Sequence, residues 1–255
     1  MSKKKIKWFK KVVVVAFCCL MILYALPFIY LKLGRQDIGY LVTKVIAEKS
    51  TENCDTDSLK ALHLMRFLSD KFIEVKGSSP KDGSPYEELL NDEAICDQQV
   101  NIFICLARRL DINGRMIFLR GNDSISRHAL AELEINGEYK MFGVYFNKVF
   151  LNKQNCLATI ADVQSRNIKK GNMDFLTRYH LTEKDYFHFF DKKYPYIVFL
   201  DNKVNFTTSE KINHSILDTW YFVFGDIGLK PYLHYYFKKD KISLKTQKRI
   251  KRLVY

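Results

Sequence analysis

The feature that most constrains this chain is the stretch from Asn91 to Asn147, where a helix pattern precedes a strand and a hairpin. After Cys96, apolar residues recur with the spacing of a helix that buries one face: Val100, Phe103, Ile104, Ala107 and Leu110. Two alternating runs, 128–135 and 138–145, then flank Asn136-Gly137, which suits the positive φ angles of a type I′ turn. A helix followed by an antiparallel hairpin predicts an α+β domain.

Cys96 falls in the first turn of the predicted helix, which we expect Asn91 or Asp92 to cap. Unpaired backbone N–H groups and the helix dipole favour an anion there, so this position should bias a thiol toward the nucleophilic thiolate. Cys105 lies two and a half turns later on the opposite face and lacks this bias. The competing interpretation of Cys96 is a small buried residue, since free cysteines are often core residues.

A two-residue turn fixes which residues of the hairpin face one another. The predicted pairs are Ile135 with Glu138, Glu132 with Met141, and His128 with Tyr145. Side chains alternate along a strand, so His128 shares a face with Gly143 and Asn147. Glu132 lies on this face too, but roughly 13 Å from His128, and a solvated strand residue is the better interpretation of it.

These segments resemble the transglutaminase-like superfamily of cysteine enzymes. The resemblance covers roughly residues 85–150 and rests on Cys-Asp-Gln-Gln (96–99), Gly-Arg-Met-Ile-Phe-Leu (114–119) and His-Ala-Leu-Ala-Glu-Leu-Glu-Ile-Asn-Gly-Glu-Tyr (128–139). It implies a papain-like core in which Cys96 is the nucleophile and His128 is the base and later the acid. The orienting Asp of the family falls on Gly143, which Val144 follows in place of Pro. Asn147 is the candidate substitute, because papain-like enzymes use an Asn in this role.

The resemblance implies acyl chemistry without a cofactor. The thiolate would attack an amide or ester carbonyl, and water or an amine would release the resulting thioester. The predicted substrate is a protein, a peptide or a component of the cell envelope. Gln98 and Gln99 are placed to shape the first turn, and the backbone N–H of Cys96 is the candidate oxyanion donor. The alternative is a catalytically inactive binding or scaffold protein of the envelope, which Gly143 favours.

The start of the chain has the pattern of a membrane anchor. Six lysines and no acidic residue precede a run without charge at 12–31, which as a helix is about 30 Å long and matches a bilayer core. We therefore expect a cytoplasmic basic tail at 1–11 and an uncleaved transmembrane helix at 12–33. The lysines place the N-terminus inside, so the domain would be periplasmic, in a single-pass protein of the inner membrane.

The net charge of +13 suggests nucleic acid as a partner, but its distribution opposes that function. Residues 1–35 carry +8 and residues 238–255 carry +7, which leaves −2 for the rest of the chain. A nearly neutral body is unlike a phosphate-binding surface. The two basic ends suit the flanks of a membrane, and the C-terminal tail is a second candidate membrane contact.

The remaining segments complete the predicted organisation. A helical lead-in at 34–84 precedes the transglutaminase-like core at 85–165, and residues 166–255 form a helical, aromatic-rich C-terminal region with the basic tail. Cys54 and Cys156 are a candidate disulfide pair. His180 and His188 lack a third ligand at metal spacing, so no metal site is predicted.

Overall fold

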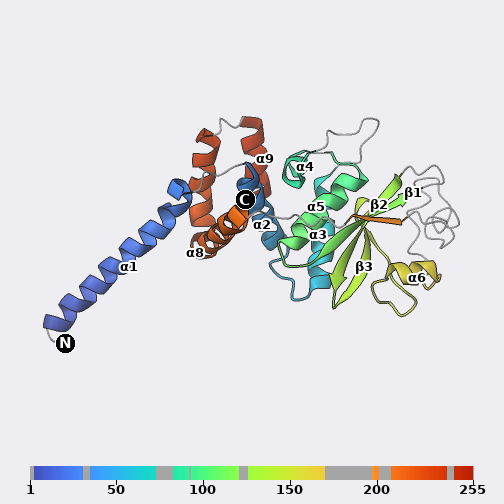
Figure 1. Cartoon of the computed structure of the whole chain (residues 1–255), viewed down its shortest axis with the longest axis horizontal. Coiled ribbons are helices and arrows are strands. Elements are labelled where there is room, and N and C mark those ends of the chain that lie inside the picture. Colours follow the sequence, from blue (N-terminus) through green and yellow to red (C-terminus); the bar gives the residue numbers. More distant parts are fainter. Residues whose placement is uncertain are drawn as a thin grey trace. The chain divides into compact units, whose positions relative to one another are not determined.

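The structure is a computed structural model, and it describes residues 3–30, 35–72, 83–91, 93–120, 126–169, 197–200, 208–239 and 244–254. The chain divides into two compact units. Unit 1 combines the two ends, Met1–Val42 and Asn205–Tyr255, and unit 2 is Thr43–Val204. Unit 2 contains helices and a sheet, so the predicted α+β class is confirmed (Figure 1).

Unit 2 is built on a five-stranded sheet with the order β4-β3-β2-β1-β5, in which neighbouring strands are antiparallel. Its strands are β1 (Gly114–Arg120), β2 (Ser126–Ile135), β3 (Glu138–Gly143), β4 (Lys148–Val149) and β5 (Ile197–Leu200). Its other elements are α3 (Asp57–Lys71), α4 (Pro85–Leu89), α5 (Cys96–Arg108), the 3₁₀ helix η1 (Val144–Phe146) and α6 (Ile160–Gln164).

The hairpin of β2 and β3 forms in the predicted register. Asn136 and Gly137 both have positive φ angles, 53° and 78°, as a type I′ turn requires. Ile135 pairs with Glu138 and Glu132 pairs with Met141, which confirms the two pairs predicted nearest the turn. The ladder ends at the pair of Ala131 and Phe142, so the expected pairing of His128 with Tyr145 is wrong.

The hairpin ends early because β3 turns away at Gly143. The chain there enters η1 and returns as β4, so that Gly143 pairs with Lys148. Val144, the first residue of η1, is fully buried. Burial of this valine favours a turn at this point, whereas the alternation in the sequence predicts that β3 continues for two more residues. The sequence pattern therefore overstates the length of β3.

Helix α5 covers one face of the sheet, which we call the α5 face. Ala129, Ala131 and Leu133 of β2 are buried on this face, and Phe103 of α5 lies 5.6 Å from the ring of Phe142. Small alanines in the strand allow the helix to approach closely. Helix α3 packs on α5 from behind and buries Leu64 and Leu68 (Figure 1).

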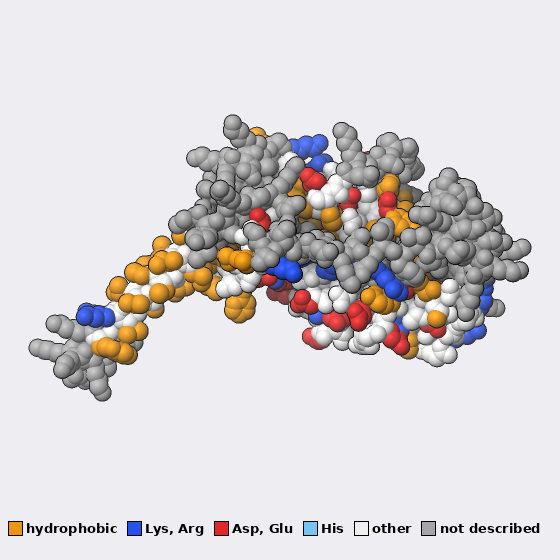
Figure 2. All heavy atoms as spheres, viewed as in Figure 1, with side chains coloured by type: hydrophobic (Ala, Val, Ile, Leu, Met, Phe, Trp, Pro, Cys, Tyr) orange, Lys and Arg blue, Asp and Glu red, His pale blue; other side chains and the backbone are white. Residues whose placement is uncertain are grey.

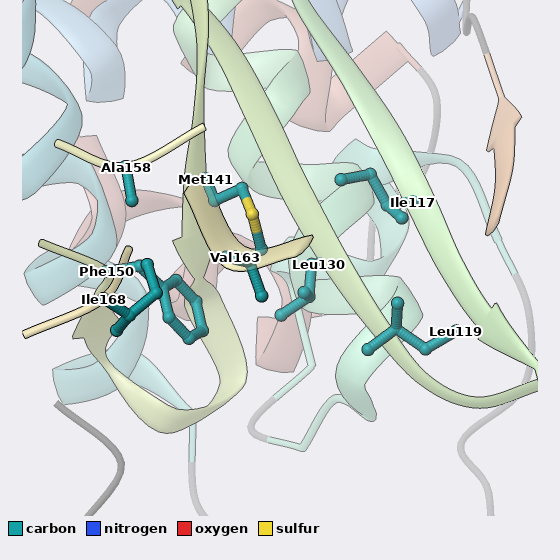
Figure 3. Close-up of a cluster of buried hydrophobic side chains, with 8 residues drawn as sticks. All are labelled: Ile117, Leu119, Leu130, Met141, Phe150, Ala158, Val163 and Ile168. Atoms are coloured by element: carbon teal, nitrogen blue, oxygen red, sulfur yellow. The ribbon is translucent and has the colours of Figure 1, made fainter. Parts of the chain in front are cut away.

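The opposite side, which we call the Phe150 face, carries a second apolar cluster. Figure 3 shows its members: Ile117, Leu119, Leu130, Met141, Phe150, Ala158, Val163 and Ile168. They come from β1, β2, β3 and the segment that contains α6, and Phe146 of η1 packs against them. Unit 2 is therefore packed on both faces of β2.

Unit 1 is helical, and its described elements are α1 (Lys3–Tyr30), α8 (Thr208–Lys239), α9 (Leu244–Val254) and the first part of α2 (Arg35–Ser50). Trp220 of α8 is buried and donates its indole N–H to the carbonyl of Tyr24 in α1. Tyr40 of α2 stacks on His214 at 3.7 Å and donates its hydroxyl to Asp218. The helical C-terminal region predicted from the sequence is present in these described residues.

Among the described residues, no helix combines the length and the apolar character that crossing a membrane requires. The structure therefore gives the predicted transmembrane anchor at residues 12–33 no support.

Candidate active site

Helix α5 begins at Cys96, as the apolar spacing predicts. Its N-cap residue is Ile95, so neither Asn91 nor Asp92 caps the helix. Buried glutamines stabilise the first turn instead: the N–H of Ile95 donates to Oε1 of Gln98 at 3.2 Å, and Nε2 of Gln99 donates to the carbonyl of Ala94 at 2.9 Å. The predicted shaping role of Gln98 and Gln99 is thus confirmed as a capping role.

The thiol of Cys96 lies against the start of β2. The backbone N–H groups of Ala129, Asp97 and Cys96 itself face the sulfur, and each lowers the pKa of the thiol. Burial has the largest effect, and together with the Asp97 carboxylate it raises the pKa of Cys96 above its usual value of 9.0. The expected bias toward thiolate is therefore wrong for this structure, because desolvation outweighs the N–H groups at the helix start.

His128 lies on the Phe150 face of β2. Its ring centroid is 4.5 Å from that of Phe146 and 6.5 Å from that of Tyr145, and its Nε2 atom is buried. This desolvation lowers the pKa of His128 from 6.5 to about 4. The imidazole is therefore neutral at pH 7 and is in the protonation state of a general base.

The thiol of Cys96 and the imidazole of His128 belong to adjacent positions at the start of β2. Pairing with β1 is regular from Leu133 back to His128, so side chains alternate, and His128 points to the face opposite Ala129. The Cys96 thiol lies against the backbone N–H of Ala129, and strand N–H groups point along the plane of the sheet. The structure thus brings the thiol of Cys96 to the backbone of the residue next to His128.

A β-bulge directly precedes His128. Leu119 pairs with His128, whereas the next residue, Arg120, pairs with Ser126, so that Arg127 has no opposite partner in β1. Bulges near active sites re-aim side chains, and a shift of one residue in pairing moves a side chain to the other face. The bulge therefore lies directly beside His128, where a shift of one residue would change the face to which the imidazole points.

Gly143 lies at the position of the orienting Asp of the family. A Cβ atom there would lie 3.2 Å from the carbonyl oxygen of Lys148, which is a close approach, and 3.5 Å from the ring of Phe150, which is an ordinary contact. Phe150 is fully buried in the cluster of the Phe150 face. A side chain at this position therefore requires a small adjustment of the Lys148 carbonyl.

Asn147, the candidate substitute for that Asp, ends η1 with a left-handed backbone, φ 51° and ψ 46°. Its N–H donates to the carbonyl of Val144, and the residue is exposed. Among the described residues, its side chain makes no hydrogen bond. The structure therefore does not bring Asn147 to His128, and its catalytic role stays a prediction.

Glu132 is buried, with 1% of its surface exposed, so its interpretation as a solvated residue is wrong. Arg115 faces it from β1 and donates Nε to its carboxylate at 2.6 Å, and this guanidinium also lies 4.0 Å from the ring centroid of Tyr139. Burial raises the pKa of Glu132, and Arg115 offsets part of that shift. In the sequence, the signal for this pair is the opposite charge of Arg115 in the neighbouring strand.

The other sequence-predicted sites are not assembled. Cys54 is buried, Cys156 is exposed, and both are free thiols, so the candidate disulfide is absent. His180 and His188 lie outside the described residues. Within the described residues, no cluster of His, Cys, Asp and Glu could hold a metal ion.

Comparison with known proteins identifies the class of this domain. Residues 44–144, which include Cys96 and His128, match the family described as the transglutaminase-like superfamily. This match confirms the resemblance to the transglutaminase-like superfamily that the sequence shows in this part of the chain. The match begins in α2, so α3 is part of the family core along with α5 and the hairpin.

A solved structure that matches part of the chain is that of a candidate cysteine protease from Cytophaga hutchinsonii, at 19% identity and a TM-score of 0.36. The similarity covers 45% of this chain and 43% of that one. No significant match exists among curated proteins.

Proposed function

We propose that unit 2 is a thiol enzyme that hydrolyses or transfers acyl groups through Cys96. The observation that carries this proposal is the position of the thiol, at the first residue of α5 and against the N–H of Ala129, one residue from His128. A thiol next to backbone N–H donors and a neutral histidine are the parts that acyl transfer needs. Both lie within the residues that match the superfamily.

The protonation states favour general-base catalysis over a preformed ion pair. At pH 7 the thiol is protonated, because burial raises the pKa of Cys96, and the imidazole is neutral. Cys96 would attack the carbonyl carbon of an amide while its proton passes to His128, and the N–H groups of Cys96 and Ala129 would donate to the oxyanion. The amine would leave with that proton, and water or a second amine would cleave the thioester.

This reaction requires the imidazole of His128 to face the thiol of Cys96. A shift of the bulge from Arg127 to the next residue would change the direction of the imidazole without breaking the rest of β2. Substrate binding at the start of β2 is the event that we propose for this shift. The proposed substrate is an amide of a protein or peptide in the cell envelope, and a periplasmic location at the inner membrane stays a prediction from the sequence.

The second candidate is a binding or scaffold module that keeps the fold without turnover. Gly143 favours it, because this residue supplies no orienting carboxylate at the position of the family Asp. In that case Cys96 is a small buried side chain at a helix start. A binding module would show no covalent reaction at Cys96 that depends on His128.

Trapping of an acyl-enzyme tests the two candidates. The full chain is incubated with p-nitrophenyl acetate, and the acylated cysteine is identified by peptide mapping. Cys105 is the matched control, since it lies on the same helix and is also half-buried. We expect an acetyl thioester on Cys96 that is lost in Cys96→Ser and retained in Cys105→Ser. Equal labelling of the two cysteines would favour the binding module.

Adding hydroxylamine then separates hydrolysis from transfer. An acyltransferase would release acetyl hydroxamate in preference to acetate, because a nucleophilic amine would compete with water for the thioester. A hydrolase would release acetate at a rate that depends little on the amine.

A further inference from the structure

The two units differ in charge and in exposed apolar surface, and this difference is independent of the chemistry at Cys96. Unit 1 holds 18 of the 41 Lys and Arg residues and 5 of the 28 Asp and Glu residues. It therefore carries the whole net charge of +13, while unit 2 holds 23 residues of each sign and is neutral. The division of the fold thus assigns the basic character of the chain to one unit.

Large apolar side chains are exposed in the same unit. Of the 15 exposed large apolar residues in the described part of the chain, 14 belong to unit 1 and only Leu59 belongs to unit 2. Most of them lie on α1: Trp8, Val12, Val13, Val14, Val15, Phe17, Leu20, Met21 and Ile22. Figure 2 shows these side chains as an apolar surface along that helix. Apolar patches of this size on a protein mark a binding surface.

The distribution around α1 indicates what covers it. Successive residues of a helix are about 100° apart, so the four exposed valines at 12–15 point in all directions around the axis. A partner helix or a groove would cover one side only, whereas lipid chains surround a helix.

The flanks of this apolar stretch suit the membrane interface. Trp8 is 68% exposed, and Lys10 and Lys11 beside it are exposed too. Tryptophan and lysine side chains next to an apolar stretch favour the headgroup layer of a membrane. In α8, Phe222 and Ile227 are 90% and 85% exposed on either side of a kink at Gly225, whose φ is 47°. We call this kinked segment, residues 222–227, the α8 elbow, and its two exposed side chains form a second exposed apolar site in unit 1.

We propose that unit 1 is a membrane-docking unit that binds the surface of an anionic lipid bilayer. The apolar residues of α1 and the α8 elbow enter the acyl layer, and the basic residues contact acidic headgroups. Its net charge of +13 opposes self-association of this unit and complements the anionic lipid.

Vesicle flotation with the full chain tests this proposal. Phosphatidylcholine vesicles are compared with vesicles that also contain phosphatidylglycerol, at low and high salt. We expect the protein to float with the anionic vesicles and to bind less at high salt. The double variant Phe17→Asp with Ile22→Asp should lower the partition coefficient at least about tenfold, because exposed apolar residues become charged. Leu59→Asp in unit 2 is the matched control and should bind like the wild type.

Fluorescence adds a readout that needs no disruptive variant. The chain has two tryptophans, and Trp220 is buried while Trp8 is exposed. Anionic vesicles should shift the emission of the wild type to the blue, and Trp8→Phe should lose the shift but still float. The proposal is overturned if the chain stays unbound to both vesicles, or if the double variant is folded by circular dichroism and binds like the control. A discrete dimer or an oligonucleotide complex, formed without lipid binding, also overturns it.

Discussion

The two faces of strand β2 differ in chemistry, and the candidate site lies at the start of this strand. The α5 face carries the small side chains of Ala129 and Ala131 beneath helix α5, whose first residue is Cys96. The Phe150 face carries the two titratable groups of the strand, His128 and Glu132. The thiol contacts the backbone N–H of Ala129, so the helix start and the histidine meet at adjacent residues of one strand.

The two sides of the candidate site differ in how fully they match the family. The thiol, the helix start and the N–H donors are in place at the start of α5. On the Phe150 face, Gly143 takes the position of the orienting carboxylate. Variants on the two faces should therefore affect stability and chemistry differently.

The largest effect on stability is expected from Phe150→Ala, because this ring is fully buried in the cluster of the Phe150 face. Removing it leaves a cavity, and the free energy of unfolding should fall by about 3–5 kcal/mol. Chemical denaturation measures the change, with the exposed Leu59→Ala as a control that should change it by less than about 0.5 kcal/mol. A loss below about 1 kcal/mol would show that this face is not tightly packed.

The next largest effect on stability is expected from the buried ion pair of Glu132 and Arg115 on the Phe150 face. Glu132→Ala leaves Arg115 without its carboxylate, and since Arg115 is 30% exposed we expect a loss of about 2 kcal/mol. Glu132→Gln keeps an acceptor for Arg115 and should cost less. Equal losses in the two variants would show that packing, and not the contact with Arg115, makes Glu132 important.

Glu132→Gln also tests the pH dependence of stability. Because burial raises the pKa of Glu132 in the folded state, its contribution is fully present below the unfolded pKa and is lost as pH rises through the folded pKa. The wild type should therefore lose stability relative to Glu132→Gln over that interval. Denaturation midpoints across a pH series measure this difference, and parallel curves would contradict it.

A smaller effect is expected at Gly143, where the family carboxylate can be restored. Gly143→Asp should cost about 1–3 kcal/mol, since its Cβ would lie 3.2 Å from the Lys148 carbonyl and its carboxylate would enter a buried position. It should not raise the rate of acylation at Cys96. Gly143→Ala has the same steric conflict without the charge and separates the two effects. A faster reaction in the Asp variant would show that the carboxylate does reach His128.

The smallest effect is expected from Asn147→Gly, which keeps the left-handed backbone and removes the side chain. Stability should change by less than about 0.5 kcal/mol. Acylation of Cys96 should be unchanged, because the side chain is exposed. A drop in rate of about tenfold or more, with stability retained, would support the orienting role that the sequence suggests for Asn147.

The sequence predicts the local parts of this site well. The apolar spacing places the start of α5 at Cys96, and the Asn136-Gly137 turn gives the register of β2 and β3. The helix start and the hairpin register both depend on residues close in the chain, so local backbone preferences and apolar spacing determine them. The superfamily follows from the same segments.

The parts that the sequence misses depend on tertiary packing. The turn at Gly143 forms because Val144 is buried, and the burial of Glu132 depends on Arg115 in another strand. The pKa of Cys96 rises because burial outweighs the helix start, an effect that no local pattern reports. Ala129 contacts the thiol through its backbone N–H. Since every residue except proline has this group, the side chain of Ala129 gives no signal in the sequence for this contact.

The most direct test of the proposed chemistry is the pH dependence of the acylation rate at Cys96, in the wild type and in His128→Ala. A second-order rate constant reports the ionisation of the free enzyme, so its acid limb should lie near the pKa of about 4 that burial gives His128. Loss of the imidazole should remove this limb and slow the reaction about 100-fold or more at neutral pH. If Cys96 reacts at the same rate in both proteins, with no acid limb, His128 is not its base, and the α5 face holds an unreactive thiol.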